Sequence, residues 1–181
     1  MYEEIFIAGS GGQGVLTIGR LIALSAADED KYVTYYPSYG AEIRGGTANC
    51  MVKISSNFIY SPIIEIPSIT IIMNMPSYVK FINKLLPSKF LFLNSSLIDE
   101  ITKISDIYKE KSLKIFKISA TDIANKIGSS VVANIIMLGA VIKATKIIEN
   151  INTVKNVIVK NFKEKFWELN FKALNAGMET V

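Results

Sequence analysis

Short apolar runs and apolar runs with helical spacing follow one another along the chain. The short runs, rich in β-branched residues, predict strands over residues 3–8, 31–36, 69–75, 89–93 and 113–118. Apolar positions three and four apart predict helices over residues 15–27, 76–86, 119–128 and 131–146. This alternation predicts an α/β fold: a single domain over residues 1–181, with a mainly parallel, Rossmann-like sheet and helices on both faces.

Three further segments refine this pattern. Residues 48–55 alternate like a strand, and Asn57 opens a turn before residues 58–60, so we expect a β-hairpin excursion there. Residues 154–178 carry apolar side chains three and four apart, which predicts one amphipathic helix with lysines on its solvated side. Residues 131–146 are apolar almost all round, which favours a helix packed in the core.

A glycine-rich turn joins the first predicted strand to the first helix. Gly9, Gly11 and Gly14 fit the pattern G-x-G-x-x-G. Glycine is needed where the backbone takes positive φ or passes close to a ligand, and the first amides of a helix have no partner of their own. Such a turn favours an anionic group, usually a phosphate. The alternative is a turn that only lets helix and strand pack closely. The candidate binding residues here are Gly9, Gly11, Gly12, Gln13 and Gly14.

Residues 37–47 form a second polar, glycine-containing stretch, which its composition predicts to be a loop. Arg44 is followed by two glycines, so a guanidinium fork lies next to bare backbone amides, a combination suited to a carboxylate or a phosphate. The alternative is that Arg44 pairs with Glu42, or holds a neighbouring subunit. The candidate binding residues of this stretch are Ser38, Tyr39, Gly40, Glu42, Arg44, Gly45 and Gly46.

The second predicted strand argues against a dinucleotide site. A Rossmann unit that binds NAD carries an acidic residue near the end of that strand, for the ribose hydroxyls. Here the strand ends in Tyr35 and Tyr36, and the acidic residues 28–30 precede it. NAD binding therefore loses most of its support despite the glycine spacing.

Composition excludes several kinds of chemistry. The 181 residues include no histidine and one cysteine, Cys50, which excludes histidine-based catalysis, the usual zinc sites, an internal disulfide and an iron–sulfur cluster held by this chain alone. We expect Cys50 to be a small core residue. A net charge of +4 is too small to indicate nucleic-acid binding. We see no signal peptide, and the longest apolar stretch, residues 131–142, is too short to span a bilayer, so we expect a cytoplasmic chain.

Four motifs in order resemble one known family. They are Gly9-Ser10-Gly11-Gly12-Gln13-Gly14-Val15, Ser38-Tyr39-Gly40-Ala41-Glu42-Ile43-Arg44-Gly45-Gly46, Asn94-Ser95-Ser96-Leu97-Ile98 and Val132-Ala133-Asn134-Ile135-Ile136-Met137-Leu138-Gly139-Ala140. Together they resemble the gamma subunit of 2-oxoacid:ferredoxin oxidoreductases. The residues of these motifs are more similar to the 2-oxoglutarate and branched-chain types than to the indolepyruvate type. Ala41 is a departure, since the family often carries proline there.

The resemblance implies a multi-subunit, oxygen-sensitive enzyme of anaerobic metabolism that oxidatively decarboxylates a 2-oxoacid such as 2-oxoglutarate or pyruvate. It implies thiamine diphosphate on alpha and beta subunits, and [4Fe-4S] clusters on the beta subunit or on a delta subunit. Electrons pass to ferredoxin, and the acyl group passes to coenzyme A. The resemblance implies no catalytic residue and no metal ligand on this chain.

Both glycine-containing loops follow predicted strands, so both are expected at the crevice edge of the sheet. We hypothesise that they face the catalytic subunits and help to hold coenzyme A, with its phosphates over the helix amides and Arg44 as the counter-charge. Two alternatives stay open. The chain could be a stand-alone module that binds a nucleotide or coenzyme A, or a purely structural subunit of the complex.

Overall fold

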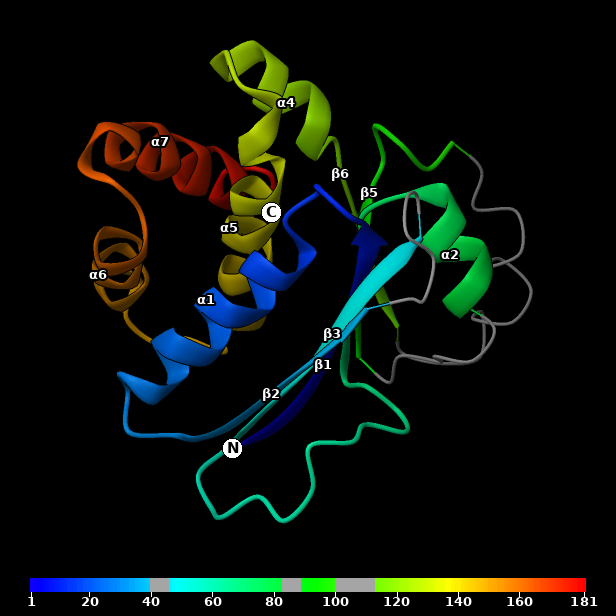
Figure 1. Cartoon of the computed structure of the whole chain (residues 1–181), viewed down its shortest axis with the longest axis vertical. Helices are drawn as coiled ribbons and strands as arrows, with labels where there is room; N and C mark the ends of the chain where they lie inside the picture. The colour runs from blue at the N-terminus through cyan, green and yellow to red at the C-terminus, as the bar shows by residue number, and fades with distance from the viewer. Residues whose placement is uncertain (40–45, 83–88, 100–112) are drawn as a thin grey trace.

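One six-stranded sheet runs through the described part of the computed structural model, which comprises residues 1–39, 46–82, 89–99 and 113–181 (Figure 1). In sheet order the strands are β2 (Tyr32–Tyr39), β3 (Thr47–Ser55), β1 (Tyr2–Ser10), β4 (Ile69–Ile72), β5 (Phe90–Asn94) and β6 (Lys114–Ile118). Strands β1, β4, β5 and β6 are parallel neighbours, whereas β3 is antiparallel to both β1 and β2. The predicted α/β class and mainly parallel sheet are confirmed.

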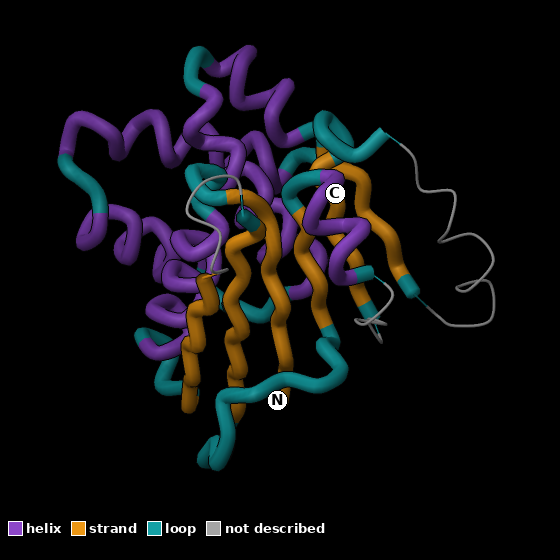
Figure 2. Tube along the Cα trace, turned by 45° about the vertical axis from the view of Figure 1, so that its right-hand side comes forward, coloured by secondary structure: helices purple, strands orange, loops and turns teal. Residues whose placement is uncertain are grey.

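The helices lie unevenly on the two faces of the sheet (Figures 1 and 2). One face carries α1 (Val15–Ala27), α4 (Ala120–Ile127), α5 (Ala133–Thr145), α6 (Ile151–Asn161) and α7 (Trp167–Met178), with short 3-10 turns at Ser130–Val132 and Glu164–Phe166. The other face carries α2 (Met75–Phe81) and the loop of residues 56–68. The strand positions explain this division, because Ile5 and Ile7 of β1 pack in the large helical core while Phe6 and Ala8 pack towards α2.

The predicted hairpin of residues 48–55 with 58–60 is wrong. Strand β3 is hydrogen-bonded between β1 and β2, and residues 58–60 form no strand. The strand β2 also continues through Pro37, Ser38 and Tyr39, which were predicted to be loop. Pro37 is tolerated there because β2 is an edge strand, where a missing backbone donor costs little.

One strand boundary also differs from the prediction. The strand predicted over 69–75 ends at Ile72, because Asn74 caps α2: its side-chain oxygen accepts a hydrogen bond of 3.0 Å from the Ser77 backbone N–H. The predicted end of that helix near Leu86 lies outside the described residues.

The single C-terminal helix predicted over 154–178 is two helices. Helix α6 ends at Asn161, and Phe162 is extended with φ −123°. The indole N–H of Trp167 donates to the Phe162 carbonyl at 2.8 Å and holds the corner. The turn lets α7 pack on α5, where a Cβ on Gly139 or Gly177 would collide with the backbone of the other helix. The predicted burial of the 131–146 helix is confirmed for its central part, since every residue from Ala133 to Ile142 is buried, whereas Val131 before the helix and Lys143 in its last turn are exposed.

None of the helices that the structure describes combines the length and the apolar character required to cross a bilayer.

Candidate functional site

The glycine turn lies between the end of β1 and the start of α1. Gly12 has φ +90° and Gly14 has φ +69°, so both take the left-handed conformation that glycine adopts without strain. Gly14 is the N-cap of α1, and no side chain caps the helix. The first turn of α1 holds no acidic residue. The leading amides of α1 therefore point at the turn without a side-chain acceptor among the described residues.

Two glycines of the turn are fixed by close packing. A Cβ at Gly9 would come within 2.5 Å of a Val15 methyl group, and a Cβ at Gly14 would collide with the Asn134 side chain. At Gly11 and Gly12, by contrast, a Cβ would meet nothing within 4 Å, and both residues are exposed. The turn therefore combines the two features that its sequence suggested. Its flanks are glycines needed for close packing, and its tip is open to a ligand.

The Gln13 side chain holds the turn to the neighbouring strand. Its Oε1 accepts hydrogen bonds from the Ser10 backbone N–H at 2.8 Å and from Asn74 Nδ2 at 2.9 Å, and its Nε2 donates to the Met73 carbonyl at 3.4 Å. Asn74 Nδ2 also donates to Ser10 Oγ at 2.5 Å. The Gln13 amide thus joins the ends of β1 and β4 in this structure, whereas the exposed backbone of the turn faces outwards.

The side-chain hydrogen bonds that join the ends of β1 and β4 extend to the end of β5. Asn94 at the end of β5 donates through Nδ2 to the Met73 carbonyl at 3.1 Å and to Thr121 Oγ1 at 2.9 Å. Asn74, Asn94 and Thr121 were not among the predicted site residues. The signal that could have found the two asparagines is their position, since each lies at or just beyond the end of an apolar strand where a buried polar side chain needs partners.

A pocket of about 610 Å³ opens beside the glycine turn. The glycine turn contributes Ser10, Gly11, Gly12 and Gly14 to its lining, and Asn134 and Asn170 add amide side chains. Most of the other lining residues are apolar and include Leu16, Val131, Phe162, Phe166 and Leu169. No charged side chain among the described residues lines it, so within that part of the chain the attraction for an anion comes from backbone amides. The mixed lining suits a ligand that has both polar and apolar groups.

The second predicted stretch begins and ends beside this turn. Thr47 is paired with Ser10, and Ala48 is paired with both Gly9 and Tyr39, so the strand ends that carry the two loops lie side by side. Ser38 is half-buried in β2, and its place in the strand alternation puts its side chain on the face away from α1. Gly46 is described next to Thr47, and Tyr39 is placed by its backbone pairing alone. Gly40, Glu42, Arg44 and Gly45 lie outside the described residues.

Two ionisable groups of strand β3 have shifted pKa values. Burial raises the pKa of Cys50 to about 12, and the thiol lies 3.7 Å from the Val15 carbonyl, so it is a neutral core group as expected. For Lys53 burial alone would lower the pKa, but its 2.9 Å ion pair with Glu4 raises the pKa above the ordinary value. In the described part of the chain, no group of three or more Cys, Asp or Glu residues is arranged to hold a metal ion.

Comparison with known proteins gives a match along nearly the whole chain. Residues 4–180 match the family described as pyruvate ferredoxin/flavodoxin oxidoreductase. The 2-oxoglutarate synthase subunit KorC of Methanothermobacter marburgensis is 31% identical over 183 residues, which cover 100% of this chain and 97% of KorC. The ketoisovalerate oxidoreductase subunit VorA of Methanothermobacter thermautotrophicus is 31% identical over 97% of this chain, which spans only 36% of that relative's length.

Solved structures agree with the fold. The gamma subunit of a keto/oxoacid ferredoxin oxidoreductase from Geobacter sulfurreducens has a TM-score of 0.81 at 26% identity, covering 98% of this chain and 97% of that one. The 2-oxoglutarate:ferredoxin oxidoreductase from Magnetococcus marinus, solved with 2-oxoglutarate, coenzyme A and succinyl-CoA bound, has a TM-score of 0.87 at 25% identity, covering 99% of this chain and 31% of that one. The chain therefore belongs to the pyruvate ferredoxin/flavodoxin oxidoreductase family, and within that family it is of the gamma-subunit type.

Proposed function

We propose that this chain acts as the gamma subunit of an enzyme that oxidatively decarboxylates a 2-oxoacid, transfers the acyl group to coenzyme A and passes two electrons to ferredoxin. The observation that carries the proposal is the similarity to KorC, which extends over both proteins from end to end. The name 2-oxoglutarate synthase favours 2-oxoglutarate as the substrate, while VorA supports a branched-chain 2-oxoacid as the second possibility.

We further propose that the glycine turn helps to bind coenzyme A. Three features support this role: the exposed tip at Gly11 and Gly12, the start of α1 without a side-chain cap, and the adjoining pocket with its mostly apolar lining. The coenzyme has the matching composition, with phosphates for the amides and a less polar arm for the apolar lining. In this proposal the turn would be shaped by Gly9, Gln13 and Gly14. It would be flanked by Ser38, Tyr39 and Gly46. The second loop would contribute Gly40, Glu42, Arg44 and Gly45, with Arg44 as the counter-charge.

The remaining cofactors belong to partners in this proposal. Thiamine diphosphate would be held by alpha and beta subunits, and [4Fe-4S] clusters by the beta subunit or a delta subunit. The site at which the 2-oxoacid is decarboxylated would therefore lie on those subunits. This chain would bind and orient coenzyme A, the acyl acceptor. The domain boundary at residues 1–181 and the cytoplasmic location also remain predictions.

Gly11 offers a charge test in the assembled enzyme. We expect Gly11→Asp to raise the KM for coenzyme A about tenfold and to leave the KM for the 2-oxoacid unchanged. A carboxylate roughly 8 Å from a phosphate repels it by about 2 kcal/mol at an effective dielectric of about 20, and salt screening reduces that value. Because a side chain at Gly11 meets nothing within 4 Å, the fold should tolerate the change. The neutral isostere Gly11→Asn is the matched control.

Arg44→Ala tests the second loop in the same assay. We expect a raised KM for coenzyme A here too, since the counter-charge is removed. If both Gly11→Asp and Arg44→Ala assemble normally and leave this KM unchanged, the loops have only a docking or structural role. Binding of NAD or FAD by the isolated chain, with no affinity for coenzyme A, would instead favour a stand-alone nucleotide-binding module.

A further inference from the structure

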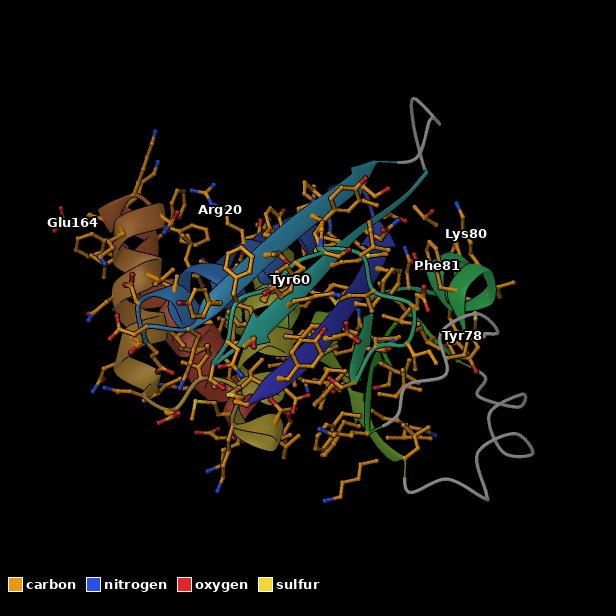
Figure 3. All side chains as sticks on the ribbon, turned by 90° about the horizontal axis from the view of Figure 1, so that it is seen from below. Arg20, Tyr60, Tyr78, Lys80, Phe81 and Glu164 are labelled. Carbon is orange, nitrogen blue, oxygen red and sulfur yellow. The ribbon has the colours of Figure 1, made fainter. Side chains whose placement is uncertain are left out.

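The face of the sheet opposite α1 carries a group of exposed apolar side chains that the proposed site does not use. We call it the aromatic face and define it by Tyr32, Tyr36, Phe58, Tyr60, Ile63 and Ile66. Two of these residues come from the edge strand β2 and four from the loop of residues 56–68. Figure 2 shows this loop crossing the sheet on the side away from α5, α6 and α7, and Figure 3 shows Tyr60 over the strands.

All six side chains of the aromatic face are exposed, and three of the rings contact one another. Tyr60 is 92% exposed, and the other five are between 45% and 64% exposed. The ring of Phe58 makes edge-to-face contacts with Tyr32 at 6.0 Å and with Tyr60 at 5.1 Å between centroids. The buried Ile64 fixes the loop beneath them, where its backbone N–H points at Met51 Sδ at 3.4 Å. The rings of Tyr32, Phe58 and Tyr60 are therefore prearranged, so they lose little conformational freedom when a partner binds.

The chemistry of the aromatic face is that of the centre of a protein interface. Strand β2 has no charged residue, and Glu65 is the one charged residue between positions 56 and 66. Aromatic residues are enriched and charged residues depleted at interface cores. With about 200 Å² for each large side chain, the exposed fractions of the six give on the order of 700 Å², close to the roughly 800 Å² that one partner contributes to a standard interface. Such a patch exceeds what a monomer ordinarily leaves in water.

The free edge of strand β2, beside the aromatic face, also has the character of a protein interface. Strand β2 is the outermost strand, and it presents an uncharged edge from Tyr32 to Tyr39. Free edges of soluble proteins are usually guarded by charges or covered by other protein. The hydroxyls of Tyr32, Tyr36 and Tyr60 make no hydrogen bond with another described residue, so they can donate to acceptors on a partner.

We propose that the aromatic face is the surface by which this chain docks on another subunit of the oxidoreductase, an inference that rests on the proposed function. KorC, nearly equal in length to this chain, is named as a subunit, whereas in VorA and in the Magnetococcus marinus chain the similar region is about a third of a longer polypeptide. Relatives of this fold thus have further protein attached to it. The partner surface fitting the aromatic face is largely apolar, weakly charged and provided with hydrogen-bond acceptors.

The test measures the affinity of the purified chain for the remaining subunits of its complex. We expect Tyr60→Glu to weaken binding at least tenfold, because a carboxylate would be desolvated among apolar groups. Tyr60→Phe, which keeps the ring and loses the hydroxyl, should weaken it about threefold. Leu24→Glu on α1 is the matched control, since Leu24 is also exposed but lies on the opposite side of the sheet; it should stay within twofold of the wild type.

Each other outcome has a distinct meaning. Equal affinity for Tyr60→Glu and the wild type overturns the docking proposal and leaves the proposed function intact. A wild-type chain that binds none of the subunits overturns the proposed function, and the docking proposal with it. If the isolated chain forms dimers that Tyr60→Glu abolishes while the complex assembles normally, the aromatic face joins two copies of this chain and the proposal is wrong. Circular dichroism of each variant confirms that the fold is retained.

Discussion

Replacing Gln13 by alanine isolates the contribution of one side chain to the glycine turn. The variant removes an acceptor shared by the Ser10 backbone N–H and Asn74 Nδ2, and a longer donor contact to the Met73 carbonyl. The glycines themselves stay unchanged. We therefore expect the connection of the turn to the end of β4 to weaken to the Asn74–Ser10 hydrogen bond, with α1 and the strands kept in place by their buried faces.

The magnitude follows from the number and quality of these contacts. A hydrogen bond contributes about 1 kcal/mol net, and a buried group left without a partner costs about 1–3 kcal/mol. Two of the three contacts have good length, and Gln13 is only partly buried, so water can replace some of what is lost. We expect the free energy of unfolding to fall by about 2 kcal/mol. In a chain of this size that corresponds to a Tm roughly 4–8 °C lower.

Urea denaturation followed by circular dichroism measures this difference directly. Gly11→Ala is the control within the same turn, because its new methyl group enters open space, and it should change stability by less than about 0.5 kcal/mol. Gln13→Glu keeps the acceptor for Ser10 but turns an oxygen towards the Met73 carbonyl, so it should also be destabilised. If Gln13→Ala is as stable as the control, the side chain does not hold the turn and the reasoning is refuted.

Other predictions concern the core. Gly177→Ala should cost about 3 kcal/mol in urea denaturation, because its Cβ would collide with the Ile136 carbonyl in α5 and backbone cannot move aside easily; a loss below about 1 kcal/mol would contradict the close packing of the two helices. Cys50 should resist iodoacetamide at pH 8 in the folded chain and react in urea, as mass spectrometry can establish. Because the folded pKa of Cys50 is raised from 9.0 to about 12, stability should fall as pH rises through this range, and Cys50→Ala should lessen that fall.

The sequence predicted those parts of the fold that depend on local pattern. The turn between β1 and α1 followed from the spacing of Gly9, Gly11 and Gly14, and the burial of α5 followed from its uniformly apolar sequence. The pairing of β3 did not follow, because a strand's own residues do not identify its neighbours. Phe58 and Tyr60 have the composition of a strand, yet at the surface the Phe58 ring packs on Tyr32 and the Tyr60 ring packs on Phe58.

The break between α6 and α7 was also beyond local pattern. Phe162 and Phe166 continue the helical spacing, and neither glycine nor proline interrupts it. The chain turns there because packing on α5 outweighs the small helix preference of two residues. In the candidate site, the glycine tip was predictable, whereas the Gln13 contact to Asn74 was not, because it joins residues 61 positions apart.

The packing of α7 over α5 also determines which truncated forms of the chain can fold and stay in solution. Helix α7 covers α5 so closely that two glycines are needed at their contact. A chain that ended before Trp167 would leave an apolar helix without its cover, and α5 has no polar side to turn towards water. Such a fragment would be retained by chaperones or would precipitate. Folding of this chain can therefore be completed only after its last helix has been synthesised. Truncation points for expression should lie beyond Met178.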